Sequence, residues 1–184
     1  MTGGDDKTAR VWDVSTLRPI RRATGDGAVI GDGGRVTALA NKRGATSIVD
    51  ASTGATKAQF KRPAVDDIES LHVDDHGRTL AINPVIDDNT AIWSVSNKQR
   101  IVALEGATLA VSHDGGHALV DRYGRGTMVD TRDVKASKTV KWDEQPVTAI
   151  FSPNDRAVVT LVGTSRRPPA RDRRACGTPA LAGC

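Results

Sequence analysis

Residues 2–13 read Thr-Gly-Gly-Asp-Asp-Lys-Thr-Ala-Arg-Val-Trp-Asp. The Gly-Asp part has the composition of a tight turn, and after it the polar residues Thr8 and Arg10 alternate with the apolar residues Ala9 and Val11. Such alternation places successive side chains on opposite faces of a strand. The stretch therefore predicts a hairpin turn that leads into a short strand ending in a Trp-Asp pair.

A strand–turn–strand pattern occurs four times along the chain. Each copy has apolar residues, a turn made of Ser, Asp, Asn, Pro, His or Gly, and apolar residues again, and the copies lie at 29–33, 73–77, 111–115 and 151–155. The fourth position of each copy falls at residues 32, 76, 114 and 154, so the gaps are 44, 38 and 40 residues. A period of roughly 40 residues is typical of a repeat architecture.

The Trp-Asp end of the pattern recurs as well. Trp12-Asp13 is followed by Val49-Asp50, Trp93-Ser94 and Val129-Asp130, and a polar turn and a fourth short strand are expected after each pair. We find no stretch with helical periodicity, and short strands separated by frequent turns are typical of all-β proteins. The sequence therefore predicts an all-β fold of four-stranded antiparallel units.

These features resemble the WD-repeat (WD40-type) β-propeller family, in which each repeat is one blade. Phe151-Ser152-Pro153-Asn154-Asp155-Arg156 is the best match to the first hairpin of that family. The resemblance covers 1–163 and implies three full blades plus two half blades. We place them at 1–23 (half blade), 27–61, 68–105, 107–143 and 146–162 (half blade). Two arrangements stay open: a fragment of a longer propeller with an incomplete ring, or a four-bladed ring in which 146–162 pairs with 1–23.

The resemblance also implies a structural hydrogen-bond network within a blade. In the family, a Trp of the third strand is linked through Ser or Thr and His to an Asp in the preceding turn. The matching positions here are Asp6, Thr8, Trp12 and Asp13 in the first repeat, and Asp87 or Asp88 with Trp93 in the third. The Gly-His step of the family is absent, so the expected network is incomplete and its residues are structural.

Composition limits the partners. Residues 164–184 carry five Arg and one Asp, which leaves 21 basic and 21 acidic residues in 1–163, so binding of nucleic acid is not expected. We predict that this Arg-, Pro-, Ala- and Gly-rich tail is disordered, and a shift of reading frame would produce it. Both cysteines, Cys176 and Cys184, lie in it. No apolar run is long enough for a membrane span and no secretory signal is visible, so a cytoplasmic protein is expected.

Four histidines are the candidate metal ligands. His72 and His76 flank one first-hairpin turn, and His113 and His117 flank the next, with Asp74, Asp75 and Asp114 among them. Nitrogen and carboxylate ligands suit a zinc-like ion. However, the two turns belong to different blades and are expected to be too far apart for one coordination shell. The favoured interpretation is therefore solvated turn residues and no metal.

Other candidate motifs are explained better by turns. Gly25–Gly34 is glycine-rich but lacks the Gly-Lys-Ser/Thr ending and the helix of a nucleotide-binding loop. The carboxylate pairs 66–67, 74–75 and 87–88 are expected in solvated turns. Ser112-His113-Asp114 has the residue types of a hydrolase triad, but consecutive residues cannot converge as a triad does. No cofactor and no small-molecule substrate are predicted.

The family resemblance implies a non-catalytic scaffold that binds a protein or peptide partner, as part of a larger bacterial signalling or regulatory protein. Two alternatives stay open. A propeller enzyme of the lactonase or quinoprotein kind would need polar residues converging on the central channel. A non-functional remnant of a truncated gene would be expected to aggregate.

Overall fold

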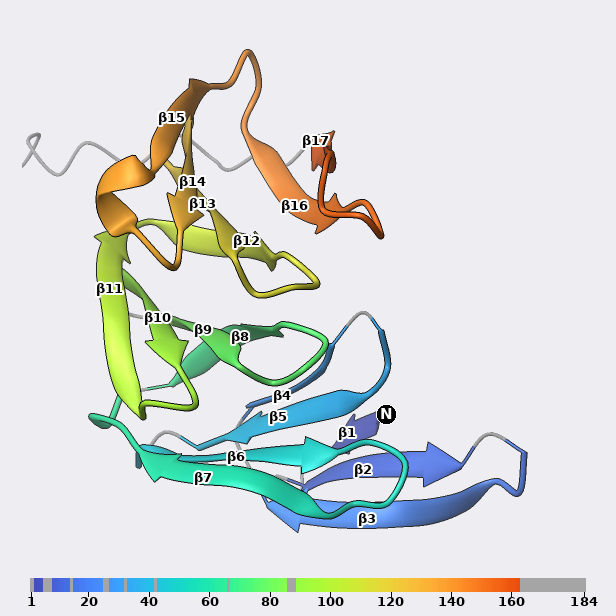
Figure 1. Ribbon diagram of the computed structural model, residues 1–184. Coiled ribbons are helices and arrows are strands. Elements are labelled where there is room, and N and C mark those ends of the chain that lie inside the picture. The colour runs from blue at the N-terminus through green and yellow to red at the C-terminus, as the bar shows by residue number, and fades with distance from the viewer. Residues whose placement is uncertain are drawn as a thin grey trace, which may run out of the picture.

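The chain folds into five antiparallel β-sheets that follow one another in chain order (Figure 1). The computed structural model describes residues 2–4, 8–13, 15–24, 27–31, 33–41, 43–65, 67–85 and 89–162. Three of the sheets have four strands, the first has three and the fifth has two, counted over the described residues. The all-β fold of four-stranded antiparallel units expected from the sequence is confirmed.

The strands of each sheet are consecutive in the chain, so each sheet is a simple meander. The first sheet contains β1 (Thr2–Gly4), β2 (Thr8–Asp13) and β3 (Arg18–Thr24). The second contains β4 (Gly27–Ile30), β5 (Val36–Ala40), β6 (Ala45–Asp50) and β7 (Thr56–Lys61). The third contains β8 (Ile68–Val73), β9 (Thr79–Pro84), β10 (Asn89–Ser94) and β11 (Gln99–Glu105). The fourth contains β12 (Ala107–Val111), β13 (His117–Arg122), β14 (Arg125–Asp130) and β15 (Lys138–Lys141), with the 3-10 helix η1 (Val134–Ala136) before β15. The fifth contains β16 (Pro146–Phe151) and β17 (Val158–Val162).

The turn after the first strand has the same backbone geometry in the last four sheets. The first residue of each turn donates its N–H to the carbonyl five residues later, at 2.8–3.2 Å, and these first residues are Gly31, Asp74, Ser112 and Ser152. The fourth residue of each turn has a left-handed φ between 55° and 71°, and these residues are Gly34, Gly77, Gly115 and Asp155. Glycine adopts this conformation without steric cost, so Asp155 is the exception among them.

The turn between third and fourth strands explains the recurring Trp-Asp pair. The Asp50 carboxylate accepts hydrogen bonds from Ser52 N at 3.0 Å, Ser52 Oγ at 2.6 Å and Thr53 N at 3.0 Å. The carboxylates of Asp13 and Asp130 accept equivalent hydrogen bonds from the backbone N–H groups two and three residues later. These hydrogen bonds, led by that from the Ser52 hydroxyl, hold the pKa of Asp50 well below its ordinary value.

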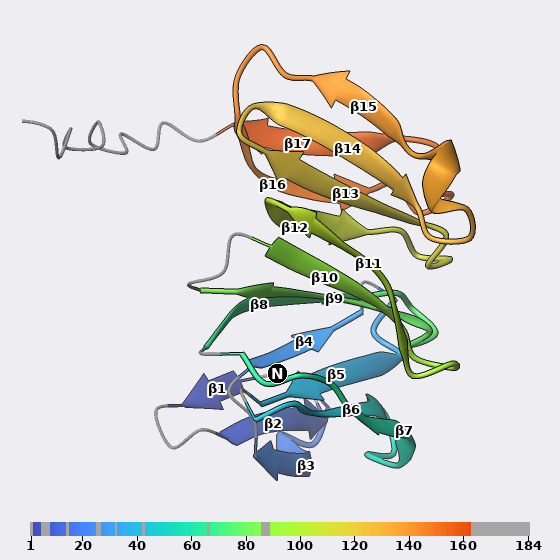
Figure 2. The ribbon, with the colours of Figure 1, turned by 90° about the vertical axis from the view of Figure 1, so that its left-hand side faces the viewer.

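Apolar side chains fill the space between neighbouring sheets. Leu80 and Ile82 of β9 belong to a core cluster with residues of the second sheet, whereas Ala81 between them belongs to a cluster with residues of the fourth sheet. Alternation along β9 therefore buries both faces of the third sheet. Figure 2 shows the first four sheets stacked one above another, while β16 and β17 overlap the fourth sheet in this view.

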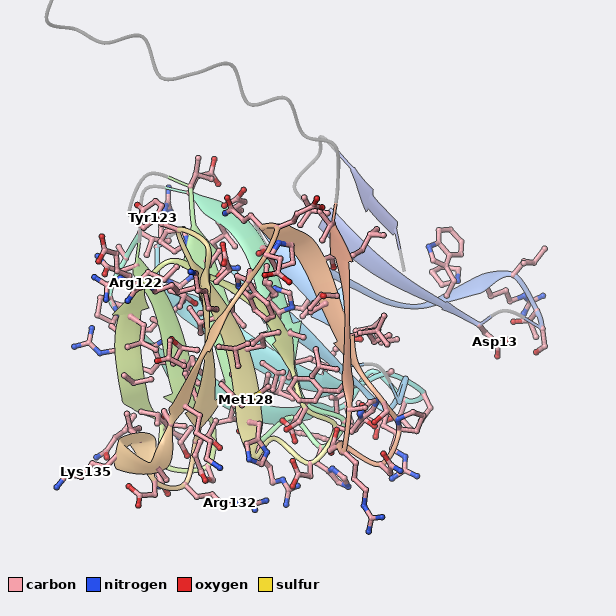
Figure 3. All side chains as sticks on the ribbon, turned by 90° about the horizontal axis from the view of Figure 1, so that it is seen from above. Asp13, Arg122, Tyr123, Met128, Arg132 and Lys135 are labelled. Atoms are coloured by element: carbon pink, nitrogen blue, oxygen red, sulfur yellow. The ribbon has the colours of Figure 1, made fainter. Side chains whose placement is uncertain are left out.

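The first strands of successive sheets lie next to each other. β4 contacts β8, β8 contacts β12, and β12 contacts β16, so these strands form one edge of the stack. This is how propeller blades are arranged around their axis. In the described residues β17 pairs with β16, and β2 pairs with β1 and β3, so the first and fifth sheets stay separate and the ring is incomplete. Figure 3 shows Asp13 on the projecting first sheet, away from the fourth sheet with Arg122, Met128 and Arg132.

Candidate binding groove

A groove of about 410 Å³ lies where the first strands of the last four sheets meet. We call it the inner groove. Its lining comes from β4, β8, β12, β16 and β17 and consists mostly of aliphatic side chains: Val29, Ile30, Val73, Leu109, Ala110, Val111, Ala149, Ile150, Val159 and Leu161, together with His72 and Thr148. The surface is therefore suited to apolar contact.

One wall of the inner groove exposes large apolar side chains to solvent. Ile150 is 53% exposed, Val159 65% and Leu161 61%. They lie on β16 and β17. Among the described residues, no sheet follows this hairpin in the stack to cover its other side. Exposed apolar residues gathered in one place mark interaction surfaces more often than apolar residues scattered singly.

Among the described residues that line the groove, His72 is the one with a titratable side chain. Its ring is largely buried and is hydrogen-bonded to the backbone of Thr108. Burial lowers its pKa to about 4, although the bond to Thr108 acts in the opposite direction. The imidazole is therefore neutral at physiological pH, and the groove gains no charge from it.

A belt of hydrogen bonds between neighbouring turns holds the sheets together at one end of the groove. Asp75 Oδ1 accepts a bond from Gly33 N at 2.6 Å, and Asp75 N donates to the His113 carbonyl at 3.2 Å. Asp155 then accepts bonds from His113 N at 2.9 Å and Asp114 N at 3.0 Å. The second, third, fourth and fifth sheets are thus linked in series, and we call this set the turn belt.

A buried polar pair joins the third and fourth sheets away from the turns. Asn83 Nδ2 donates to the Thr108 carbonyl at 2.8 Å, and Thr108 N donates back to Asn83 Oδ1 at 2.9 Å. The hydroxyls of Thr90 and Thr108 lie 2.7 Å apart. Because these groups are buried and paired, they fix the position of β12 against β9.

The structure brings the backbones of the two histidine-bearing turns together. The turns of the third and fourth sheets are in direct contact, since Asp75 N bonds to the His113 carbonyl. The imidazoles still do not converge: His72 faces the inner groove, His76 is exposed, and His113 Nδ1 is 2.8 Å from Asp155 Oδ1. His117 starts β13 and is half-buried. Among the described residues no group of three or more His, Cys, Asp and Glu could hold a metal ion.

The expectation of solvated carboxylates was wrong for Asp74. This residue is 1% exposed, and its carboxylate accepts bonds from Arg78 N at 2.6 Å and Thr79 N at 2.7 Å. It closes its own turn, as Ser112 does by accepting from His117 N at 2.8 Å. In the Ser112-His113-Asp114 run, Ser112 Oγ donates to Asp114 and His113 pairs with Asp155, so no triad forms.

The residues of the blade network lie partly outside the described residues, as Asp6, Asp87 and Asp88 do, and so do Gly25, Asp26, Asp32, Asp66 and the tail 164–184. Thr8 and Trp12 lie on β2, and Trp12 is 37% exposed. Trp93 is 7% exposed and packs against Phe60, with ring centroids 5.9 Å apart. Its indole nitrogen has no hydrogen-bond partner among the described residues.

Two functional features escaped the sequence reasoning. The groove combines residues from four repeats that are each unremarkable alone. Asp155 as an inter-sheet link was also missed, although one signal was present: it is an acidic residue at the position where three earlier turns have glycine. An acidic side chain retained at a left-handed position needs a compensating interaction.

Comparisons with known proteins bear on the fold. No family model and no curated protein matches the chain. Among solved structures, the chain is similar to Kuenenia stuttgartiensis hydrazine synthase, a β-propeller-type protein, with a TM-score of 0.54 and 17% sequence identity. The match covers 77% of this chain and 43% of that chain. At this identity the likeness shows the fold alone, and it supports a partial β-propeller.

Among the described residues no helix has the length and apolar character to cross a membrane.

Proposed function

We propose that this chain is part of a WD-repeat-type propeller that serves as a non-catalytic scaffold, with a protein or peptide partner bound at the inner groove. The observation that carries the proposal is the apolar lining of the groove, with Ile150, Val159 and Leu161 exposed on one wall. The proposal includes a cytoplasmic location and a place in a larger signalling or regulatory protein.

The fifth sheet also offers a backbone docking edge. In the described residues β17 is hydrogen-bonded to β16 on one side and carries no strand on the other. An extended peptide can add to such an edge through main-chain hydrogen bonds, while alternate side chains enter pockets. We therefore expect the partner to present an extended apolar segment that lies along β17 and places side chains in the groove.

The chemistry of the lining supports binding over acid–base catalysis. Its titratable side chain, His72, is neutral at physiological pH because burial lowers its pKa to about 4. Contact with aliphatic side chains is favourable by about 25 cal/mol for each Å² of apolar surface removed from water. A lactonase-type or quinoprotein-type activity remains the alternative and would have to use residues beyond this lining.

Selection of peptides from a random display library on the immobilised full chain tests the proposal. We expect enrichment of extended apolar peptides. Ile150→Asp should lower the affinity of the chain for the selected, purified peptides at least tenfold, because it places a charge on the apolar wall. The matched control is Val140→Asp, at a residue of β15 that is 43% exposed and lies outside the groove. Equal loss of binding in both variants, or soluble protein that selects no peptide, would contradict the proposal.

A further inference from the structure

A second pocket, of about 390 Å³, lies between the third sheet and the connection that leads to it from the second, and it shares no lining residue with the inner groove. We call it the linker pocket. It is lined by residues 62–65, which lead from β7 towards β8, and by residues of β9, β10 and β11. The chain makes this connection on the left-hand side of Figure 1. Pro63, Val65 and Pro84 make its walls partly apolar, and Arg62 and Arg100 are its charged residues among those described.

Among the described residues, Arg62 is a buried cation without a counter-charge. It is 4% exposed, and its guanidinium donates from Nη1 to the Pro63 carbonyl at 2.9 Å and from Nη2 to the Asn41 carbonyl at 2.8 Å. Both acceptors are neutral, and burial lowers the pKa of Arg62. Buried charges in proteins are normally paired. Within the described part of the chain, the wall of the linker pocket therefore carries an uncompensated positive charge.

Two buried N–H donors in the same wall also have no acceptor among the residues that the structure describes. These are Arg62 Nε and Trp93 Nε1. Nearly all buried polar groups in native proteins have a hydrogen-bond partner, so an exception requires an explanation. Both missing partners are acceptors, because the guanidinium and the indole N–H can only donate. An oxygen that is both an acceptor and negatively charged would satisfy the donors and the uncompensated charge together.

We propose that the linker pocket binds the carboxylate of an acidic residue in a peptide segment. A guanidinium pairs well with a carboxylate, because its N–H groups match the two oxygens. A single carboxylate charge balances the single buried charge of Arg62, and the apolar walls receive the neighbouring aliphatic side chains. Arg100 is exposed at the pocket and attracts the acidic segment. Both unpaired nitrogens are covered, so binding requires the Arg62 side chain to shift towards the pocket.

A peptide titration of the full chain, followed through the Trp93 indole N–H signal in an NMR spectrum, tests this proposal. The probe is acetyl-Leu-Glu-Leu-amide, and Trp93→Phe assigns the signal by removing it. We expect a saturable shift with this peptide and none with acetyl-Leu-Gln-Leu-amide, which has the same size but no charge. Equal shifts with both peptides would overturn the proposal. Tighter binding of acetyl-Leu-phosphoserine-Leu-amide would overturn the assignment to a carboxylate.

Substitutions separate this site from a purely structural role of Arg62. We expect Arg100→Gln, an exposed change, to weaken the Glu peptide roughly threefold and to reduce the dependence of binding on salt. Trp93→Phe keeps the aromatic packing and should weaken binding about tenfold, measured by calorimetry. Arg125→Gln, at an exposed Arg on β14, is the matched control and should change nothing. Loss of binding in Arg125→Gln as large as in Arg100→Gln would overturn the proposal.

Binding at the linker pocket and binding at the inner groove can be tested independently of each other. Ile150→Asp, which disrupts the groove, should leave the titration with the Glu peptide unchanged, because the two sites share no lining residue. Loss of the titration in Ile150→Asp would contradict a separate site.

Discussion

At the scale of single residues, Asp155 shows how a strained backbone position is stabilised by the contacts it makes. Its φ is 55°, where the equivalent turns have glycine at 68°, 71° and 70°. Its carboxylate accepts bonds from His113 N, His113 Nδ1 and Asp114 N at 2.8–3.0 Å. One side chain thereby links the fourth and fifth sheets, and its hydrogen bonds offset the cost of the left-handed conformation.

Asp155→Ala should lower the free energy of unfolding by about 2 kcal/mol, because it removes three hydrogen bonds and keeps the strained φ. Asp155→Gly loses the same bonds but relieves the strain, so it should cost about 1 kcal/mol less. Urea denaturation measures both. Glu144→Ala, at an exposed acidic residue, is the control and should change stability little. A larger loss in the Gly variant than in the Ala variant would contradict strain at this position.

The same carboxylate predicts a dependence on pH. Burial raises the pKa of Asp155, but hydrogen bonds from the His113 side chain and from the backbone of His113 and Asp114 outweigh it, so the pKa lies below its ordinary value. A carboxyl with a lowered pKa in the folded state stabilises the fold above about pH 4 and loses this contribution as the pH falls through the folded pKa. Between pH 5 and pH 3, stability should therefore fall more steeply in the wild type than in Asp155→Asn. Parallel urea midpoints in the two proteins would contradict this.

At the scale of elements, the repeat made most of the fold predictable. Turn residues at fixed offsets and the Trp-Asp pairs mark the ends of strands, because both depend on local backbone geometry. The environment of those turns was not predictable in the same way. Asp74 looks like a surface residue in the sequence, but contact with the next sheet buries it. The inner groove depends on side chains from β4, β8, β12 and β16 that meet only after the sheets have packed, so no single motif encodes it.

Equivalent turns between third and fourth strands allow a matched prediction. Lys98 and Gly54 occupy the same turn position, with φ of 56° and 72°. Lys98→Gly should raise the free energy of unfolding by about 0.5–1 kcal/mol, because glycine tolerates the left-handed conformation, and Gly54→Ala should lower it by about 1 kcal/mol. Thermal melting should show shifts of about 2–4 °C in opposite directions. A destabilised Lys98→Gly variant would show that the lysine side chain contributes more than its backbone strain costs.

At the scale of the whole molecule, the sheets differ in how completely their neighbours cover them. The third sheet has core clusters on both faces, with Leu80 and Ile92 fully buried. The fifth sheet packs on the fourth through Phe151, but Val159 and Leu161 stay more than half exposed. In a stack of repeats, stability is approximately the sum of each unit and its contacts with its neighbours. The fifth sheet should therefore open more readily than the third.

Hydrogen exchange measures this gradient directly. We expect the slowest amide exchange in β9 and β10, intermediate exchange in β13, and the fastest of the three in β16 and β17, because local opening exposes less apolar surface where one face is uncovered. Asp155→Ala should speed exchange in β16 and β17 and leave β9 unchanged, since the turn belt reaches the fifth sheet through Asp155. Equal acceleration in every sheet would mean that the chain opens as one cooperative unit, and the description of stacked, separately covered sheets would then be wrong.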